Sequence, residues 1–561
     1  MEFGYYHGYT SRKSCHTLWG QSRSHSRPET WRPLLKSSEA APARQRWDYF
    51  WLILLLLILG LGSAALVRAQ ALPQLIFGHD CSVFYDGGWR AYNGIKPHVD
   101  FYSPLGPVSY LYVALGYVLF GPNVNSLAYI NALALPVIGG LVWGLLRNRI
   151  PPFWLLWASL LTGFCFVSAH HLRLPLGVLS YGGLYNHQGY AGLLFLGFLL
   201  FAPQGRAGMR QLWINAFVAG AIVSLLFFLK ISYFIAAAPL LLAYALLSVK
   251  PRPPLSGIIA GFSLVTFLIL AYLDFNVGGM LRDLSIAAHA RAHLVNLIDP
   301  VHHLHGMEWQ LLAMLLIGLA SSAPKLSRDL TIIFASFLLS GFLAYESNLL
   351  FGPYDEIPVF AGFSILCAVR LQTAGYDESE ARYKAVIGLC CLIFVGIYFV
   401  PDARSLWVAA SLRASEPVPL ETFDSDSMRS LKVDGLGGGL PHPDTYVAKI
   451  NDGLALIRQA GLEHEACFTL DFTNPFPFAL RSPPPRGGAT FWQENFSFAR
   501  DSYPAPALAF RGVDILMIPK FPEIPWETPV LLEIYGPYIA SHFIPVAESK
   551  HWRLLKNIAL K

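Results

Sequence analysis

The sequence is poor in charged residues and in recognisable catalytic motifs. Charged side chains make up 14% of its 561 residues, whereas soluble domains average about 25%. The seven cysteines contain no CxxC pair and no ligand-like spacing, so neither a zinc site nor a disulfide framework is predicted. Walker loops, dinucleotide-binding glycine fingerprints, HExxH and GxSxG are absent as well. The long apolar runs and a few polar loops therefore carry most of the information.

Apolar sequence is what the chain has in abundance. Hydrophobic residues make up 54% of it, and the mean hydropathy is +0.44. They come in blocks separated by short polar or Pro/Gly-rich breaks, which is typical of a protein that crosses a membrane several times. The sequence therefore predicts a polytopic all-α membrane protein. The predicted apolar segments are 49–67, 105–121, 126–146, 153–170, 189–203, 212–229, 232–249, 255–275, 309–323, 329–346, 356–371 and 383–400.

Positive charge indicates how the chain is oriented. The net charge of +5 comes largely from residues 1–48, so it reports on topology and indicates no nucleic-acid partner. Residues 1–48 are predicted to be a disordered cytoplasmic tail before a retained first helix. If the later basic breaks are cytoplasmic too, residues 68–104 form a first outer loop and the C-terminal domain also lies outside. The breaks contain Arg147, Arg149, Arg206, Arg210, Lys250, Arg252, Lys325, Arg328, Arg370, Arg382 and Lys384.

The segment 105–121 conflicts with a simple alternation of spans. Two apolar runs lie between the first outer loop and Arg147, where the alternation requires an odd number. Residues 105–121 are rich in Tyr and Gly and are bounded by prolines, so we expect an interfacial helix on the outer surface. About eleven transmembrane helices then remain. The alternative is that 105–121 spans the membrane, and that Arg147 and Arg149 break the rule.

The sequence changes character after the transmembrane core, which is predicted to cover 49–400. Residues 401–561 are polar and Pro-rich and contain no spanning run, so they predict a small soluble α/β domain. VAKINDGLALIRQAG is typical of an amphipathic helix, and ACFTLDF and DILMIPKF of buried strands. ASHFIPVAE and HWRLLK are typical of a closing strand pair, and RSPPPRGG of a loop.

The first outer loop carries three aspartates close to the membrane. They are Asp80, Asp86 and Asp100, in the stretch FGHDCSVFYDGGWRAYNGIKPHVDFYSPLGP. A carboxylate near a low-dielectric surface is costly and usually functional, and a partly desolvated Asp is a workable general base. The alternative is that these acids are simply solvated, which is the simpler interpretation of Asp86 taken alone.

The order of features in this region resembles that of the GT-C superfamily of membrane glycosyltransferases. The features are an Asp just after the first span, a helical run ending in AYNG, then KPHVDFYSPLGP and a Tyr-rich segment ending in LFG. A second match is FFLKISYFIAAAPLLL (227–242), a span pair broken by a lysine. The resemblance covers roughly residues 49 to 250. It is strongest to bacterial lipid-linked sugar transferases, namely the aminoarabinose transferase of lipid A and the protein O-mannosyltransferase-like group.

The resemblance implies a function and a place for it. By position Asp80 is the catalytic base, the donor is a polyprenyl-phosphate sugar, and the product is inverted. The protein would then act at the periplasmic face of a bacterial inner membrane on a glycan, glycolipid or protein acceptor. The lipid phosphate that leaves carries charge, which Lys230 together with Arg282 or Arg291 is expected to balance. A snorkelling Lys230 and a solvated surface for the two arginines are the alternatives.

Further candidate substrate-binding residues come from the other outer loops. Asp86, Arg90 and Asp100 are expected to shape the sugar site with residues 180–192, where Asn186 and His187 stand in place of the second acid of some relatives. That departure puts a two-carboxylate metal site in doubt. No cofactor is certain, and a divalent cation (Mg²⁺ or Mn²⁺) held by Asp80 and Asp100 is left open. Glu356 begins an apolar helix, where a negative charge suits the N-terminus; contact with a sugar hydroxyl is the alternative.

Two other functions compete with the glycosyltransferase. A lipid or glycan transporter or flippase would suit many spans, but the predicted spans have almost no ionisable residue near their centres. A non-catalytic scaffold of an envelope complex is also compatible with lone acids and a soluble domain. Substitution of Asp80 by Asn discriminates the first alternative, and sugar transfer by the purified protein discriminates the second.

Overall fold

A computed structural model describes most of the chain. It covers residues 40–74, 78–170, 179–203, 205–247, 254–292, 308–320, 328–346, 357–373, 381–415, 421–433 and 444–558. The chain divides into a unit of residues 1–48 and a unit of residues 49–561. The predicted tail lies almost wholly outside the described residues, as does Glu356.

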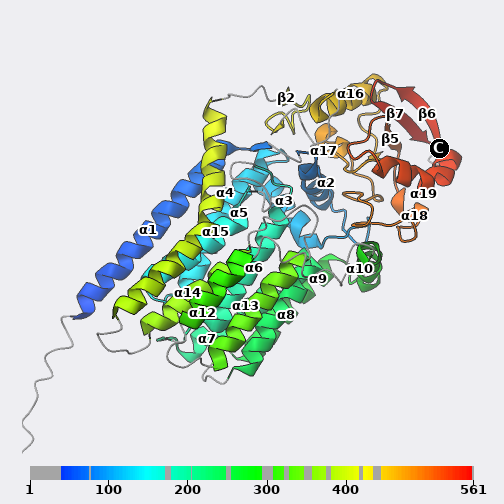
Figure 1. Cartoon of the computed structure of the whole chain (residues 1–561). Helices are drawn as coiled ribbons and strands as arrows, with labels where there is room; N and C mark the ends of the chain where they lie inside the picture. Colours follow the sequence, from blue (N-terminus) through cyan, green and yellow to red (C-terminus); the bar gives the residue numbers. More distant parts are fainter. Residues whose placement is uncertain are drawn as a thin grey trace, which may run out of the picture. The chain divides into compact units, whose positions relative to one another are not determined.

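Each predicted apolar segment coincides with a helix (Figure 1). Six helices in the described part of the chain are long and apolar enough to cross a membrane, and several other apolar helices are shorter. A polytopic, mostly helical core is therefore confirmed, whereas the number of eleven spans stays a prediction. The helices are α1 Ala40–Ala69, α2 Cys81–Tyr92, α3 Pro107–Phe120, α4 Asn125–Leu146, α5 Pro152–Val167, α6 Leu184–Phe201, α7 Met209–Leu229, α8 Ile231–Leu246, α9 Leu255–Tyr272, α10 Val277–Ala292, α12 Glu308–Ala320, α13 Arg328–Glu346, α14 Pro358–Thr373 and α15 Ala381–Ser415.

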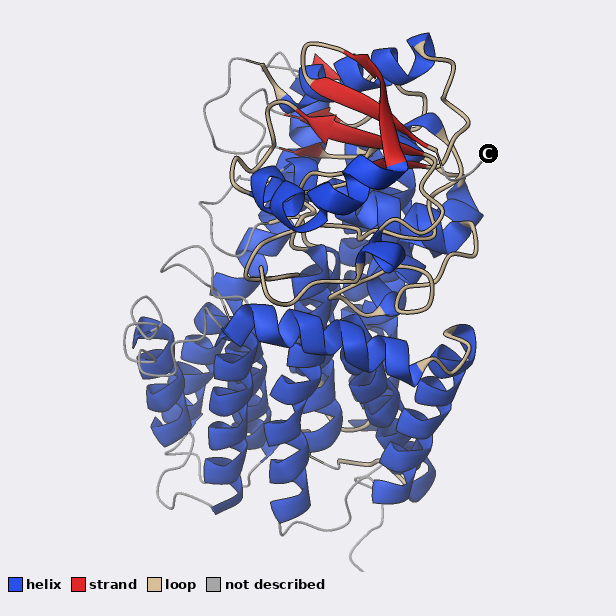
Figure 2. Cartoon of the chain, turned by 90° about the vertical axis from the view of Figure 1, so that its right-hand side faces the viewer, coloured by secondary structure: helices blue, strands red, loops and turns tan. Residues whose placement is uncertain are grey.

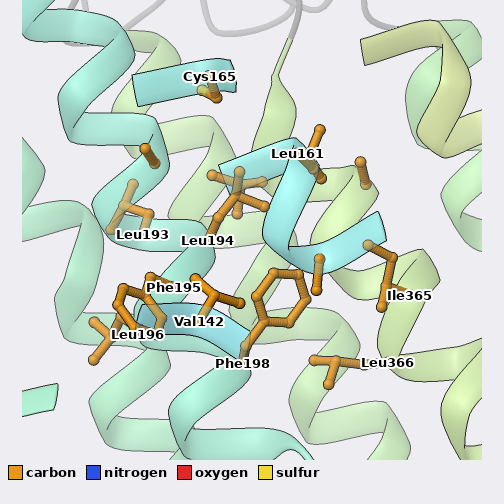
Figure 3. Packing of buried hydrophobic residues seen from close by; sticks show 14 of the residues in the cluster. Val142, Leu161, Cys165, Leu193, Leu194, Phe195, Leu196, Phe198, Ile365 and Leu366 are labelled. Atoms are coloured by element: carbon orange, nitrogen blue, oxygen red, sulfur yellow. The ribbon is translucent and has the colours of Figure 1, made fainter. Parts of the chain in front are cut away.

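Apolar side chains fill the interior of the bundle and also cover its outside. Leu161 of α5, Leu194 and Phe198 of α6, and Leu366 of α14 lie in one buried cluster (Figure 3). Helices α7 and α9 pack so closely that a Cβ at Gly220 would lie 1.9 Å from the Ile258 carbonyl oxygen. Many leucines and isoleucines on α1, α9 and α12 are exposed. Close packing through small residues and an apolar exterior are typical of helices in a bilayer.

The helix α3 has both of its ends at one end of the bundle. The Gly106 N–H before it donates to the carbonyl of Leu229, the last residue of α7, over 3.1 Å. The Val124 N–H after it donates to the carbonyl of Ser427, in the C-terminal region, over 3.0 Å. A helix that crossed the membrane would separate its ends. We therefore propose that α3 does not span, in line with the interfacial helix expected from the sequence.

The last core helix is longer than expected. The sequence suggested that the helical core ends near residue 400, but α15 continues through Pro401 to Ser415. A proline in a helix interior costs about one hydrogen bond and a steric clash, and packing of α15 against α5 and α14 offsets this cost. The predicted boundary between residues 400 and 401 therefore falls inside α15.

The C-terminal domain holds the predicted helix and strands. A four-stranded sheet has the order β4-β5-β7-β6, in which β4 is parallel to β5 and the other pairs are antiparallel. Figure 2 shows the strands in red. Strands β4 and β5 are separated and followed by helices, and β6 and β7 form a hairpin, so the small α/β region is confirmed. The elements are α16 Tyr446–Gln459, β4 Cys467–Thr469, α17 Phe476–Leu480, α18 Pro506–Ala509, β5 Ile515–Pro519, α19 Glu527–His542, β6 Phe543–Glu548 and β7 Trp552–Asn557.

A second, very small sheet joins the first loop to the C-terminal part of the chain. Strand β1 (Pro73–Gln74), which follows α1, runs parallel to β3 (Lys432–Val433), and β3 is antiparallel to β2 (Glu421–Thr422). The segment that carries Asp80 is therefore held from both sides: by α1 before it and by residues from the far end of the chain.

Candidate active site

Asp80 lies where the loop after α1 meets the loop before α6. It ends the short 3₁₀ helix η1 (Gly78–Asp80), directly before α2, and its side chain is 28% exposed. A Cβ at Gly182, in the loop before α6, would lie 2.7 Å from the Cβ of Asp80 and 2.9 Å from its Oδ2. Only glycine permits this approach. One carboxylate oxygen of Asp80 thus faces the loop just before α6, the helix that carries Asn186 and His187.

A line of aromatic rings leads from the start of α2 to Lys230. The ring centroid of Phe84 lies 5.8 Å from that of Tyr185, and the Lys230 ammonium lies 5.2 Å from the Tyr185 centroid. Lys230 is nearly buried, is extended between α7 and α8, and also lies 5.8 Å from the ring of Tyr233. Contacts of this kind stabilise a cation with little access to water.

The two residues in place of a second acid lie on different sides of α6. Asn186 accepts a hydrogen bond from the Tyr233 hydroxyl over 3.1 Å, so it belongs to the Lys230 side. His187 is buried: its Nε2 lies 2.6 Å from the His170 carbonyl oxygen and its Nδ1 4.0 Å from Asp402 of α15. Asn186 and Lys230 thus share the contact with Tyr233, and Asp80 lies beside Gly182 just before the same helix, whereas His187 faces His170 and Asp402.

Asp86 and Arg90 are completely buried, contrary to what a substrate contact needs. Arg90 Nε donates to Asp86 Oδ2 over 2.8 Å, and Arg90 Nη1 donates to the carbonyls of Pro485 and Gly487 over 2.7 Å each. Burial raises the pKa of Asp86 and the charge of Arg90 opposes it, with the result at about 6. With no exposed surface, the pair fastens α2 to the loop RSPPPRGG and offers nothing to a sugar in this structure.

Asp100 also contacts the C-terminal domain. Its carboxylate accepts the Lys96 N–H over 2.9 Å and lies 3.3 Å from Arg511 Nη2. Its partners differ from those of Asp80, and within the described ranges no group of three or more His, Cys, Asp or Glu side chains is arranged to hold a metal ion. The arrangement gives no support to a cation shared by Asp80 and Asp100.

The two arginines of α10 contact different parts of the structure. Arg282 is 43% exposed and pairs with the buried Asp283 over 2.6 Å. The guanidinium of Arg291 lies 5.2 Å from the ring centroid of Phe496, in the C-terminal domain. Both residues remain candidates for an approaching phosphate, Arg282 with the larger exposed surface.

Sequence reasoning missed the charged partners of Asp80. His79 Nε2 lies 3.1 Å from Asp80 Oδ1, and His79 Nδ1 lies 3.3 Å from Glu523 Oε1. Glu523 Oε2 accepts a hydrogen bond from Lys449 Nζ over 2.5 Å, and the Glu523 N–H is within 3.2 Å of Asp471 Oδ2. His79 stood beside Asp80 in the sequence and deserved notice; nothing local in the sequence marks Glu523 or Lys449.

The charged neighbours of His79 and Glu523 shift the pKa values of both side chains. Burial lowers the pKa of His79, but the charge and hydrogen bond of Asp80, together with those of Glu523, raise it to about 10. Burial raises the pKa of Glu523, but His79 and Lys449 lower it to about 2. For Asp471, burial raises the pKa to about 7. Lys449, Asp471 and Glu523 also line a small pocket in the C-terminal domain, together with Tyr446 and Trp552.

Two crystal structures are similar in fold to this chain. ArnT from Cupriavidus metallidurans in the apo state is 13% identical, with a TM-score of 0.47 over 92% of this chain and 99% of its own. ArnT from the same organism bound to undecaprenyl phosphate is 11% identical, with a TM-score of 0.47 over 92% of this chain and 98% of its own. No family model matches the chain, and no curated protein matches it.

Proposed function

We propose that the protein is a membrane glycosyltransferase that moves a sugar from a polyprenyl-phosphate donor to an acceptor at the periplasmic face. Two observations support the proposal: the partly exposed carboxylate of Asp80 lies beside Gly182, just before α6, and the nearly buried ammonium of Lys230 lies against Tyr185, near the start of that helix. A base and a cation on the two sides of one region are what displacement of a phosphate from a sugar requires.

The proposed reaction is a single displacement. Asp80 accepts the proton of an acceptor hydroxyl while its oxygen forms a bond to the anomeric carbon of the sugar. The bond from that carbon to the phosphate oxygen breaks, and its electron pair leaves with the polyprenyl phosphate. Attack opposite the leaving group inverts the anomeric configuration. Oδ1 of Asp80 is engaged by His79, so Oδ2, beside Gly182, is the oxygen that takes the proton.

Lys230 is proposed to meet the lipid phosphate. Its ammonium contacts ring faces at 5.2 and 5.8 Å in a nearly buried position. A phosphate that enters there would make a charge-assisted hydrogen bond, which is roughly twice as strong as a neutral one. Asn186, on the same side, is proposed to contact a sugar hydroxyl. Arg282 and Arg291 on α10 are proposed to guide the phosphate group toward the site.

The proposal is tested with purified protein and labelled undecaprenyl-phosphate-linked hexoses and pentoses. We expect release of undecaprenyl phosphate together with transfer of label to an acceptor of glycan, glycolipid or protein class, with inverted configuration by NMR. Mass spectrometry of lipid that copurifies should detect a polyprenyl phosphate. Donor that crosses the membrane of proteoliposomes with its sugar still attached would instead establish a flippase and overturn the proposal.

A further inference from the structure

A row of alternating charges runs from Asp80 into the C-terminal domain. Going outward, it consists of the Asp80 carboxylate, the His79 imidazole, the Glu523 carboxylate and the Lys449 ammonium, with contacts of 3.1, 3.3 and 2.5 Å. Its first two members come from the loop after α1. Glu523 follows β5 and Lys449 lies on α16, so the row crosses from the membrane core to the soluble domain.

The surroundings of His79 favour a charged imidazole. A neutral imidazole has one N–H donor and one acceptor nitrogen, whereas both nitrogens of His79 face carboxylate oxygens. An imidazolium, which carries an N–H group on each side and a positive charge, is the form that suits two carboxylates at ion-pair distance. The ring also packs edge-on against Tyr446 and Phe472, at centroid distances of 6.1 and 5.1 Å, so its plane is fixed as well.

Burial makes the members of the row dependent on one another. The side chains of His79, Glu523 and Lys449 are 5%, 8% and 8% exposed, whereas that of Asp80 is 28% exposed. Removing one partner of a buried charge pair leaves the other uncompensated, at a large cost. The one member with access to solvent is therefore held in place by three that have almost none. Asp471 faces the backbone of Glu523, and the Tyr446 hydroxyl is hydrogen-bonded to Ser82.

We propose that the C-terminal domain completes the catalytic site: Glu523, held by Lys449, fixes the imidazolium of His79, and His79 orients the carboxylate of Asp80. This inference rests on the proposed function, in which Asp80 is the base. His79 and Glu523 are positioning residues, because they act on the acceptor only through Asp80. Undocking of the domain would remove Glu523 from His79 and release the Asp80 carboxylate from its orientation.

The network is tested first without an activity assay. Exchange of the imidazole C2 proton, followed by mass spectrometry over a pH series, reports the protonation midpoint of a single histidine. In the full-length protein we expect His79 to titrate near the raised value of about 10. In Glu523→Gln the midpoint should fall by about 1 to 3 pH units, the usual effect of losing an adjacent opposite charge. An unchanged midpoint would overturn the inference.

Turnover separates positioning from a merely structural role. With an undecaprenyl-phosphate-linked sugar that the wild type accepts, Glu523→Gln should lower kcat about tenfold or more and leave KM for the donor nearly unchanged. Glu523→Asp should restore part of kcat. The matched control is Arg511→Gln, which breaks another contact between the first loop and the domain; it should lower the thermal midpoint without moving the His79 midpoint.

The two possible failures have different signatures. If the wild type transfers sugar and Glu523→Gln transfers it with the same kcat, the inference fails and the proposed function stands. If the wild type transfers no sugar from any polyprenyl-phosphate donor, the proposed function fails, and the catalytic meaning of the network fails with it even where the His79 midpoint shifts as expected.

Discussion

The segment from His79 to Arg90 makes two charged contacts with the C-terminal domain that differ in what they leave exposed. At its start, the His79 imidazole joins Asp80 to Glu523, and the Asp80 side chain stays 28% exposed. Farther along, on α2, the side chains of Asp86 and Arg90 are both 0% exposed. Arg90 donates to Asp86 and to the loop at 481–488, and Asp86 also accepts a hydrogen bond from Asn474. Exposure therefore distinguishes the two aspartates: Asp80 remains accessible as a candidate base, whereas Asp86 has a structural role beside Arg90.

Substitution of the two aspartates should give the largest difference in turnover. Asp80→Asn removes the proposed base and should lower turnover by about 10²- to 10⁴-fold, the usual worth of general base catalysis. Asp86→Asn keeps a neutral hydrogen-bonding group beside Arg90 and should change turnover far less. Steady-state transfer from a labelled undecaprenyl-phosphate sugar measures both variants. Equal losses in the two would show that the division by burial is wrong.

Removal of Arg90 should affect stability more than it affects turnover. Arg90→Met leaves the Asp86 carboxylate buried without its cation and removes two hydrogen bonds to the loop. Breaking a buried pair in this way costs about 3 to 5 kcal/mol. Thermal unfolding, with limited proteolysis of the C-terminal domain, measures the effect. The double variant Arg90→Met with Asp86→Asn should recover part of the loss, and no recovery would argue against the pair as the cause.

Substitution of Lys230 should weaken binding of the sugar donor. Lys230→Gln removes the ammonium that is proposed to meet the lipid phosphate, and KM for the donor should rise about tenfold or more, since hydrogen bonds to charged groups contribute about 1.5 to 3 kcal/mol. Lys96→Gln, which breaks the more exposed pair with Asp274, is the control. A donor KM equal to that of the wild type in Lys230→Gln would show that the phosphate binds elsewhere.

His79 should also make the stability of the protein depend on pH. Its pKa is raised from 6.5 to about 10 in the folded protein. The stabilisation is therefore fully present below pH 6.5 and is lost as the pH rises through about 10, at about 1.4 kcal/mol per pH unit at most. Thermal midpoints measured from pH 6.5 to 10 should fall in the wild type and fall less steeply in His79→Gln. Parallel curves would mean that His79 is not held as an imidazolium.

Arg282 should show the smallest effect. Its guanidinium is 43% exposed, and its partner Asp283 keeps hydrogen bonds from His98 and the Ser103 backbone when the arginine is removed. Because the guanidinium is largely exposed, solvent screens its interaction with Asp283. Arg282→Gln should therefore change donor KM by no more than about twofold to fivefold, measured beside Lys230→Gln. A larger effect than that of Lys230→Gln would exchange the proposed roles of the two cations.

Features that depend on long local patterns were predictable from the sequence. Every apolar segment proved to be a helix, because a helix satisfies the backbone hydrogen bonds within a single run of this length. The strands β4 and β5 were predictable from short apolar runs between turns. The end of α15 was not predictable. Residues 401–415 are more polar than the apolar run before them, and composition alone does not show that they continue the helix.

The candidate site was predictable only in part. Asp80 stood out because it follows the first span, and Lys230 because it interrupts two apolar runs. The spacing of Asp86 and Arg90, four residues apart on a helix, already indicated an ion pair and could have replaced the substrate role assigned to them. Glu523 lies far from His79 in the chain, in a loop with no pattern of its own, so only the folded structure reveals their contact.

The most direct measurement of the role of Asp80 is chemical rescue. Asp80→Ala removes the carboxylate and leaves space next to Gly182, where a small carboxylate such as formate can enter. A general base at this position predicts that Asp80→Ala loses turnover and that added formate restores part of it, while formate leaves the wild type unchanged. Turnover of Asp80→Ala at the wild-type rate, with or without formate, would contradict the account.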